Sequence, residues 1–114
     1  MTIAIDPAAS FRDNLAQLPP VDGVARIDLI DAAGGVVGTI ENRPGKQGSL
    51  AVYRHLAQAF GTLDAEAAAH GLRLFAEHVP DARARPGAHP NVDRLLAIAQ
   101  GGAPLSIRVV PHAG

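Results

Sequence analysis

The stretch VARIDLID, Val24 to Asp31, decides the fold class of this chain. Its residues alternate between two sets that would point to opposite faces of a strand: Ala25, Ile27 and Leu29 in one set, and Arg26, Asp28 and Ile30 in the other. This period of two is typical of a β-strand with one buried face. After the turn residues DAAGG (31–35), the stretch VVGTIEN (36–42) is again apolar, so the two stretches predict a β-hairpin.

A third strand and several helices complete the predicted fold. The segment LSIRVV (105–110) reads as a strand, and because a hairpin alone is marginally stable we expect it to pair with the first strand or its neighbour. Apolar spacing and N-cap residues predict four helices: 11–18 after Ser10, a helix to residue 60 after Ser49, 65–79 after Asp64 and 92–99 after Asn91. The order α-β-β-α-α-α-β predicts a two-layer α+β domain with a small, mostly antiparallel three-stranded sheet. Antiparallel pairing of the first and last strands would place Arg108 opposite Asp28 on the solvent side.

Length and composition indicate one folded domain. The chain has 114 residues, of which 47% are hydrophobic and 18% charged, and this is too apolar for a disordered segment. We expect the domain to occupy residues 10–110, with a flexible leader over 1–9 and a tail over 111–114.

Charge and cysteine content exclude several classes of protein. The formal net charge is −1, which offers no broad positive field, so we expect no nucleic-acid partner. Cysteine is absent, which excludes disulfides, iron–sulfur clusters and thiol nucleophiles. The first 15 residues lack the basic and apolar regions of a signal peptide, and no run of 18 apolar residues occurs, so we expect a cytoplasmic protein with no membrane association. We predict no cofactor.

The tripeptide RPG occurs twice, in RPGKQGSL (43–50) and in RPGAHPNV (85–92). Each arginine stands six residues before a predicted N-cap, Ser49 in the first segment and Asn91 in the second. Proline followed by glycine is typical of a type II turn. The simpler interpretation is therefore that two similar turns deliver the chain to two helices.

The sharper interpretation is a site for a small anionic ligand. A helix N-terminus offers free N–H groups and the positive end of the helix dipole, which attract phosphate or carboxylate. The candidate ligand-binding residues are Arg43, Lys46, Ser49, Arg85 and Asn91. Lys46 is the only lysine of the chain, and it precedes the last glycine of its loop, so the segment is not a Walker A motif and a nucleoside triphosphatase is disfavoured. A joint site requires both loops on one face.

A second group of polar residues lies in EHVPDARARPGAHPNVD (77–93). Here His78, Asp81 and His89 are candidate catalytic residues, because a histidine beside a carboxylate can act as a general acid or base. The same three residues are weaker candidates for metal ligands, since no strong metal-binding spacing such as HExxH is present. The simpler interpretation places His78 in a helix end, Asp81 at a turn and His89 in an exposed loop.

The alternative function is an interaction module without catalytic activity. At least one sheet edge stays open in the predicted fold, and Val37 and Ile30 would lie on its outer face. Exposed edges and apolar faces favour association, so a homodimer is the alternative to a ligand-binding protein.

The chain resembles a small bacterial family catalogued as a domain of unknown function. The resemblance covers roughly residues 11–110 and rests on IENRPGKQGSL (40–50) and FAEHVPDARARPGAHPNVDRLL (75–96). It implies no activity, ligand or catalytic residue.

Overall fold

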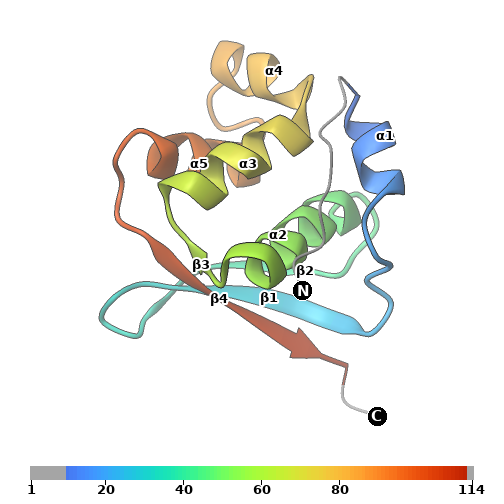
Figure 1. The fold of residues 1–114 in the computed structure, drawn as a ribbon, viewed down its shortest axis with the longest axis vertical. Helices are drawn as coiled ribbons and strands as arrows, with labels where there is room; N and C mark the ends of the chain where they lie inside the picture. Colours follow the sequence, from blue (N-terminus) through green and yellow to red (C-terminus); the bar gives the residue numbers. More distant parts are fainter. Residues whose placement is uncertain (1–9, 113–114) are drawn as a thin grey trace.

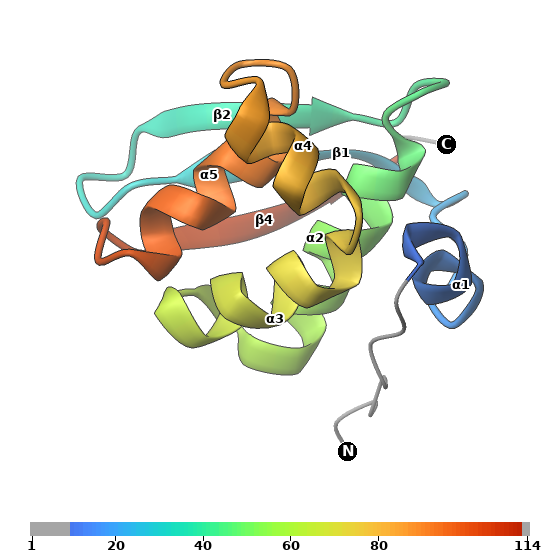
Figure 2. The same cartoon turned by 90° about the horizontal axis from the view of Figure 1, so that it is seen from above.

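The computed structural model describes residues 10–112 and has two layers, with the helices on one face of an antiparallel sheet (Figure 1). Along the chain the elements are α1 (Phe11–Ala16), β1 (Val24–Ile30), β2 (Val36–Glu41), α2 (Gln47–Phe60), β3 (Thr62–Leu63), α3 (Ala65–Phe75), α4 (His78–Ala84), α5 (Pro90–Ala99) and β4 (Leu105–Pro111). Seen from above, the helices lie over the sheet, with α1 to one side (Figure 2). The longest described helix, α2, has 14 residues, and none of the described helices is long and apolar enough to cross a membrane.

The two-layer α+β fold is confirmed, with four strands and five helices where three strands and about four helices were predicted. The additional strand, β3, has two residues, which is too short for any periodicity to appear. The predicted leader over residues 1–9 lies outside the described residues. Pro111, predicted to be the first residue of the tail, is the last residue of β4, where it pairs with Val24.

The hairpin and the pairing of the C-terminal strand are as predicted. The sheet order is β2-β1-β4-β3, so β1 is central and β4 lies antiparallel beside it. Ile27 and Leu29 are fully buried and point from β1 into the core. At the hairpin, the Asp31 carboxylate accepts hydrogen bonds from the backbone N–H groups of Ala33 (3.0 Å) and Gly35 (2.9 Å), which closes the turn.

The outer face of the sheet carries a buried carboxylate. Arg108 donates to Asp28 at 2.8 Å, as the predicted register requires, and Arg26 and Thr39 also donate to it, each at 3.1 Å. The Asp28 side chain is only 5% exposed, so the expected surface pair is in fact an acid covered by its partners. The hydrogen bond from Arg108 lowers the pKa of Asp28 most, burial opposes it, and Arg26 and Thr39 lower it further, so the carboxylate stays charged.

The helix predicted over 65–79 begins at Ala65 as expected but ends at Phe75, because the chain breaks at Ala76. This residue has a φ of 50°, and among the described residues it is the only one other than glycine with a positive φ. The Asn14 side chain donates to the carbonyl of Leu74 (2.9 Å), and the Glu77 carboxylate accepts from the backbone N–H of Phe11 (2.6 Å). Contacts with α1 therefore hold the break, and the residues that follow form a separate helix, α4 (His78–Ala84).

Replacing Ala76 by glycine is expected to stabilise the protein. A side chain at positive φ costs about 1–3 kcal/mol, and the greater freedom of glycine in the unfolded chain offsets part of that gain. We expect a net gain of about 1 kcal/mol, or a rise of about 4 °C in Tm measured by circular dichroism. The matched control is Ala97→Gly in the exposed part of α5, which should lower Tm. A fall in Tm for both variants would contradict strain at Ala76.

Candidate functional site

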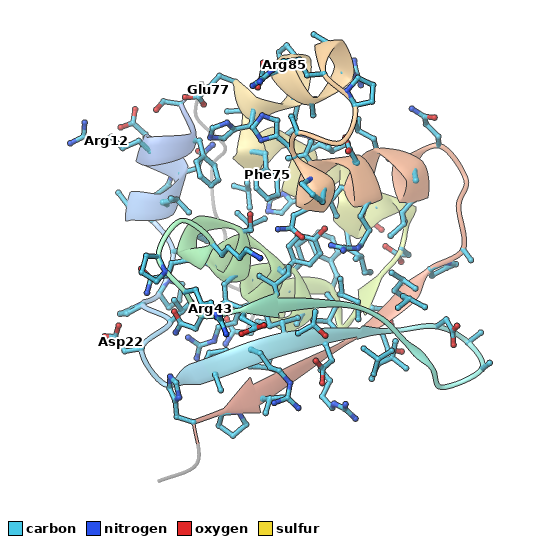
Figure 3. The ribbon with its side chains drawn as sticks, turned by 180° about the vertical axis from the view of Figure 1, so that it is seen from behind. Arg12, Asp22, Arg43, Phe75, Glu77 and Arg85 are labelled. Atoms are coloured by element: carbon cyan, nitrogen blue, oxygen red, sulfur yellow. The ribbon has the colours of Figure 1, made fainter. Side chains whose placement is uncertain are left out.

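Both RPG loops open onto one pocket of about 630 Å³. Its walls come from α1, β2, the first turn of α2, the end of α3, the first residue of α4 and residues 88–94. The residues that line it include Phe11, Lys46, Ser49, Phe75, His78, His89, Asn91 and Arg94. We call this cavity the RPG pocket. In Figure 3, Phe75 lies between Arg85 above it and Arg43 below it.

The two RPG segments form the predicted turns. The backbone N–H of Lys46 donates to the carbonyl of Arg43 at 2.9 Å, and that of Ala88 donates to Arg85 at 3.0 Å. Gly45 and Gly87 have φ values of 84° and 91°, as the third position of a type II turn requires. The similarity of the two segments in sequence is therefore a similarity in backbone conformation.

The two helices that follow these turns start earlier than predicted. Lys46 is the N-cap of α2 and His89 is the N-cap of α5, so Ser49 and Asn91 lie within the first turns and are not caps. Pro90 is the first residue of α5, where its fixed φ suits a helix start. The side chains of Lys46 and His89 make no capping hydrogen bond, whereas the predicted caps of α1 and α3 do form. The first-turn N–H groups of α2 and α5 are thus left without a side-chain cap at the RPG pocket.

The pocket draws its positive charge from a different set of side chains than the sequence predicted. Arg43 pairs with Glu41 at 2.7 Å, Arg85 pairs with Asp81, and neither arginine lines the RPG pocket. Lys46 and Arg94 do line it, and neither forms an ion pair with a carboxylate within the described part of the chain. Among residues 10–112, no aspartate or glutamate lines the pocket. The predicted residues Lys46, Ser49 and Asn91 are therefore brought together, and the two predicted arginines are not.

Arg94 is the residue that sequence reasoning missed. Its Nη1 donates to Asn91 Oδ1 (2.9 Å) and to the Tyr53 hydroxyl (3.2 Å), and its guanidinium lies 5.7 Å from the centre of the Tyr53 ring. A Cβ at position 38 would lie 2.8 Å from Nη2 of Arg94, so Gly38 leaves room for the guanidinium beside β2. The only signal in the sequence was the spacing of Asn91 and Arg94, which places both on one face of a helix.

Tyr53 connects α2 to the start of α5. It is fully buried, and its hydroxyl donates to the carbonyl of Asn91 at 2.6 Å. Burial raises the pKa of Tyr53 to about 12, although Arg94 acts in the opposite direction, so the hydroxyl keeps its proton and remains a donor. Through these two contacts, the buried tyrosine fixes the position of Asn91 and Arg94.

Two of the three candidate catalytic residues are in contact. Asp81 Oδ2 lies 2.5 Å from His89 Nε2, and the same carboxylate binds Arg85 through two hydrogen bonds. Arg85 chiefly, and His89 after it, hold the pKa of Asp81 far below its usual range. Because an ionised carboxylate only accepts, Nε2 of His89 carries the hydrogen of this bond. His78 lies beside this pair, with its ring 5.4 Å from that of His89.

A metal site at these residues was the weaker alternative. Within residues 10–112, no group of three or more histidine, aspartate or glutamate side chains is arranged to hold a metal ion. Asp81, which would have to be a ligand, already binds Arg85 and His89. The geometry at Asp81 is therefore that of an ion-paired carboxylate that orients a histidine.

Comparisons with known proteins identify the family and no closer relative. No curated protein and no solved structure matches this chain. One family model, described as an uncharacterized protein conserved in bacteria (DUF2322), matches residues 11–109, which include every element that lines the RPG pocket. The resemblance to a bacterial family of unknown function is thus confirmed, and the chain belongs to the DUF2322 family.

Proposed function

We propose that this protein binds a small anionic ligand in the RPG pocket. The observation that carries the proposal is the charge of the lining. Among the described residues, Lys46 and Arg94 face the pocket without a carboxylate partner, and none of the lining side chains is acidic. Two cations left unneutralised at one cavity favour an anion from solution. A pocket of about 630 Å³ is also in the usual size range for small-molecule sites.

The two helix starts support the same conclusion. The N-terminus of an α-helix carries roughly half a positive charge. In α2 and α5 the side chain of the N-cap residue accepts no hydrogen bond from the first-turn N–H groups. Arg94 is held in place by Asn91 and Tyr53, so little entropy is lost when it binds a ligand. Lys46 is exposed, and its long side chain with several rotatable bonds can reach an anion in the pocket.

His89 adds a group that can exchange a proton with the ligand. Asp81 holds Nε2 of the ring, which leaves Nδ1 as the acceptor in the neutral imidazole. In our proposal His89 is the proton acceptor or donor, Asp81 orients it, and His78 is the second imidazole of the pocket wall. Binding does not depend on this step.

The test is thermal unfolding with phosphate, sulfate and simple carboxylates added singly to the protein and to two variants. A ligand present at 100 times its Kd adds about 2.7 kcal/mol, which would raise Tm by about 10 °C. We expect Lys46→Ala to remove most of this rise. The matched control is Arg43→Ala, in the same loop, because Arg43 pairs with Glu41 and does not line the pocket.

Two results would contradict the proposal. One is the absence of any rise in Tm with these anions at millimolar concentration. The other is an equal loss of the rise in Lys46→Ala and Arg43→Ala, which would mean a general charge effect with no contribution from the pocket.

Homodimerisation is a second candidate, and one observation favours it. Val36 and Val37 are 52% and 53% exposed, they are the exposed large hydrophobic residues of the described chain, and both lie on the edge strand β2. An apolar edge strand favours pairing with another chain. Sedimentation velocity over a hundredfold range of concentration should then show a dimer that Val37→Lys dissociates, whereas a monomer at every concentration would exclude this candidate.

A further inference from the structure

One wall of the RPG pocket is a continuous row of aromatic rings. Phe75 stacks on Phe11 with ring centres 5.3 Å apart, the His78 ring meets Phe11 edge-on at 4.7 Å, and the His89 ring lies 5.4 Å from that of His78. All four residues line the pocket. We call them the aromatic row.

The aromatic row lies directly beside the cationic part of the pocket. A Cβ at position 48 would lie 2.9 Å from Cζ of Phe11, so Gly48, two residues after Lys46, is what lets this ring rest on the first turn of α2. At its other end the row finishes at His89, the N-cap of α5. The aromatic row therefore spans from one RPG loop to the other.

The aromatic row is not simply part of the core. Phe75 is buried, but Phe11, His78 and His89 are only partly buried, and their remaining surface faces the pocket. Leu15, which is also only partly buried, adds further apolar surface to the lining. An inorganic anion would interact with the cations and leave this surface in contact with water, whereas an apolar group on the ligand would cover it.

We infer that the ligand is an organic anion in which a phosphate or carboxylate group is attached to a planar apolar body. The anionic group binds at Lys46 and Arg94, and the planar body lies against Phe11 and His78. This inference rests on the proposed function and adds the ligand's apolar part. A phosphate monoester fits better than a monocarboxylate, because a dianion matches two unpaired cations.

Matched ligand pairs test the inference by isothermal titration calorimetry. Methyl phosphate and phenyl phosphate share the anionic group and differ in the apolar body, and acetate and benzoate form the same pair for carboxylates. We expect phenyl phosphate to bind about tenfold or more tightly than methyl phosphate, because the ring buries apolar surface and contacts aromatic side chains. Benzoate should bind more tightly than acetate but more weakly than phenyl phosphate.

The variant Phe11→Leu keeps most of the apolar volume and removes the ring. It should reduce the advantage of phenyl phosphate to less than about threefold and leave the affinity for methyl phosphate unchanged. A ¹⁵N–¹H correlation spectrum that matches the parent outside the pocket checks that the variant is folded. In the parent, phenyl phosphate should shift the amide signals of Phe11 and Gly48.

The possible failures are distinguishable. Equal affinities for methyl and phenyl phosphate in the parent, or an advantage of the ring that survives Phe11→Leu, would overturn this inference and leave the proposed function standing. If neither ester binds, or if both bind equally well to Lys46→Ala, the proposed function fails and this inference fails with it.

Discussion

Replacing Tyr53 by alanine is expected to lower the free energy of unfolding by about 4 kcal/mol, a large part of the stability of a domain of this size. The tyrosine is fully buried at the centre of α2, and its removal leaves a cavity between α2 and α5. The carbonyl of Asn91 also loses its hydrogen-bond donor. Urea unfolding followed by circular dichroism measures the loss.

Tyr53→Phe is the matched control, because it keeps the ring and removes only the hydroxyl. We expect it to cost about 1 kcal/mol, since Asn91 and Arg94 each lose one partner. If the hydroxyl positions Arg94, anion binding to Tyr53→Phe should also be several-fold weaker. Unchanged anion binding would mean that Asn91 alone is enough to hold Arg94 in position. If Tyr53→Phe lost as much stability as Tyr53→Ala, the hydroxyl and not the packing of the ring would account for the loss, which would contradict this prediction.

Acidification below pH 6.5 is expected to destabilise the protein through a pair of histidines outside the pocket. Nε2 of His55, on α2, lies 3.1 Å from Nε2 of His70, on α3, and His55 is only 2% exposed. When both rings are neutral, the N–H of one ring can donate to the bare nitrogen of the other. When both rings are protonated, neither Nε2 can accept, and two positive charges face each other. Burial chiefly lowers both pKa values, assisted by the charge of His70 at His55 and of Arg73 at His70.

The sign follows from proton linkage. The unfolded histidines titrate near pH 6.5 and the folded ones lower, so below pH 6.5 the unfolded chain binds more protons and stability falls as the pH falls. Above pH 6.5 this contribution is complete. We expect Tm to fall by roughly 5 °C between pH 7 and pH 5.5, a window that lies above the ordinary titration range of aspartate and glutamate.

The double variant His55→Gln, His70→Gln isolates this pair. Glutamine keeps a polar side chain in each position and does not titrate, so the dependence of Tm on pH should become much flatter even if the variant is less stable overall. The same slope in the parent and the double variant would assign the acid sensitivity to other groups and refute the prediction.

The parts of the fold that were predicted correctly from the sequence are those whose signals lie within a few consecutive residues. The alternation in Val24–Ile30 identified the central strand, and the same pattern placed Asp28 opposite Arg108. The caps Ser10 and Asp64 accept hydrogen bonds from backbone N–H groups three residues ahead, as predicted. Each of these signals needs only the chemistry of a few adjacent positions, or the regular spacing of a strand.

The candidate site was predicted in part, and the errors have a common cause. Lys46, Ser49, His89 and Asn91 do line one pocket, because the two RPG turns deliver two helices to the same place. The charged residues around them were misassigned because their partners decide their positions. Glu41 draws Arg43 away from the pocket, and Asp81 draws Arg85 away. No local pattern indicated that Arg94 would take their place.

The sequence by itself determined the central hairpin, the antiparallel C-terminal strand, the two RPG turns and the absence of any thiol chemistry. Only the tertiary structure decided where α2 and α5 begin, why the chain breaks at Ala76, and which cations face the pocket. The physical reason is one of range. Strand periodicity and turns come from interactions over two to four residues, whereas Tyr53 meets Arg94 across 41 positions and Phe11 meets Glu77 across 66, and such contacts exist only once the helices have packed on the sheet.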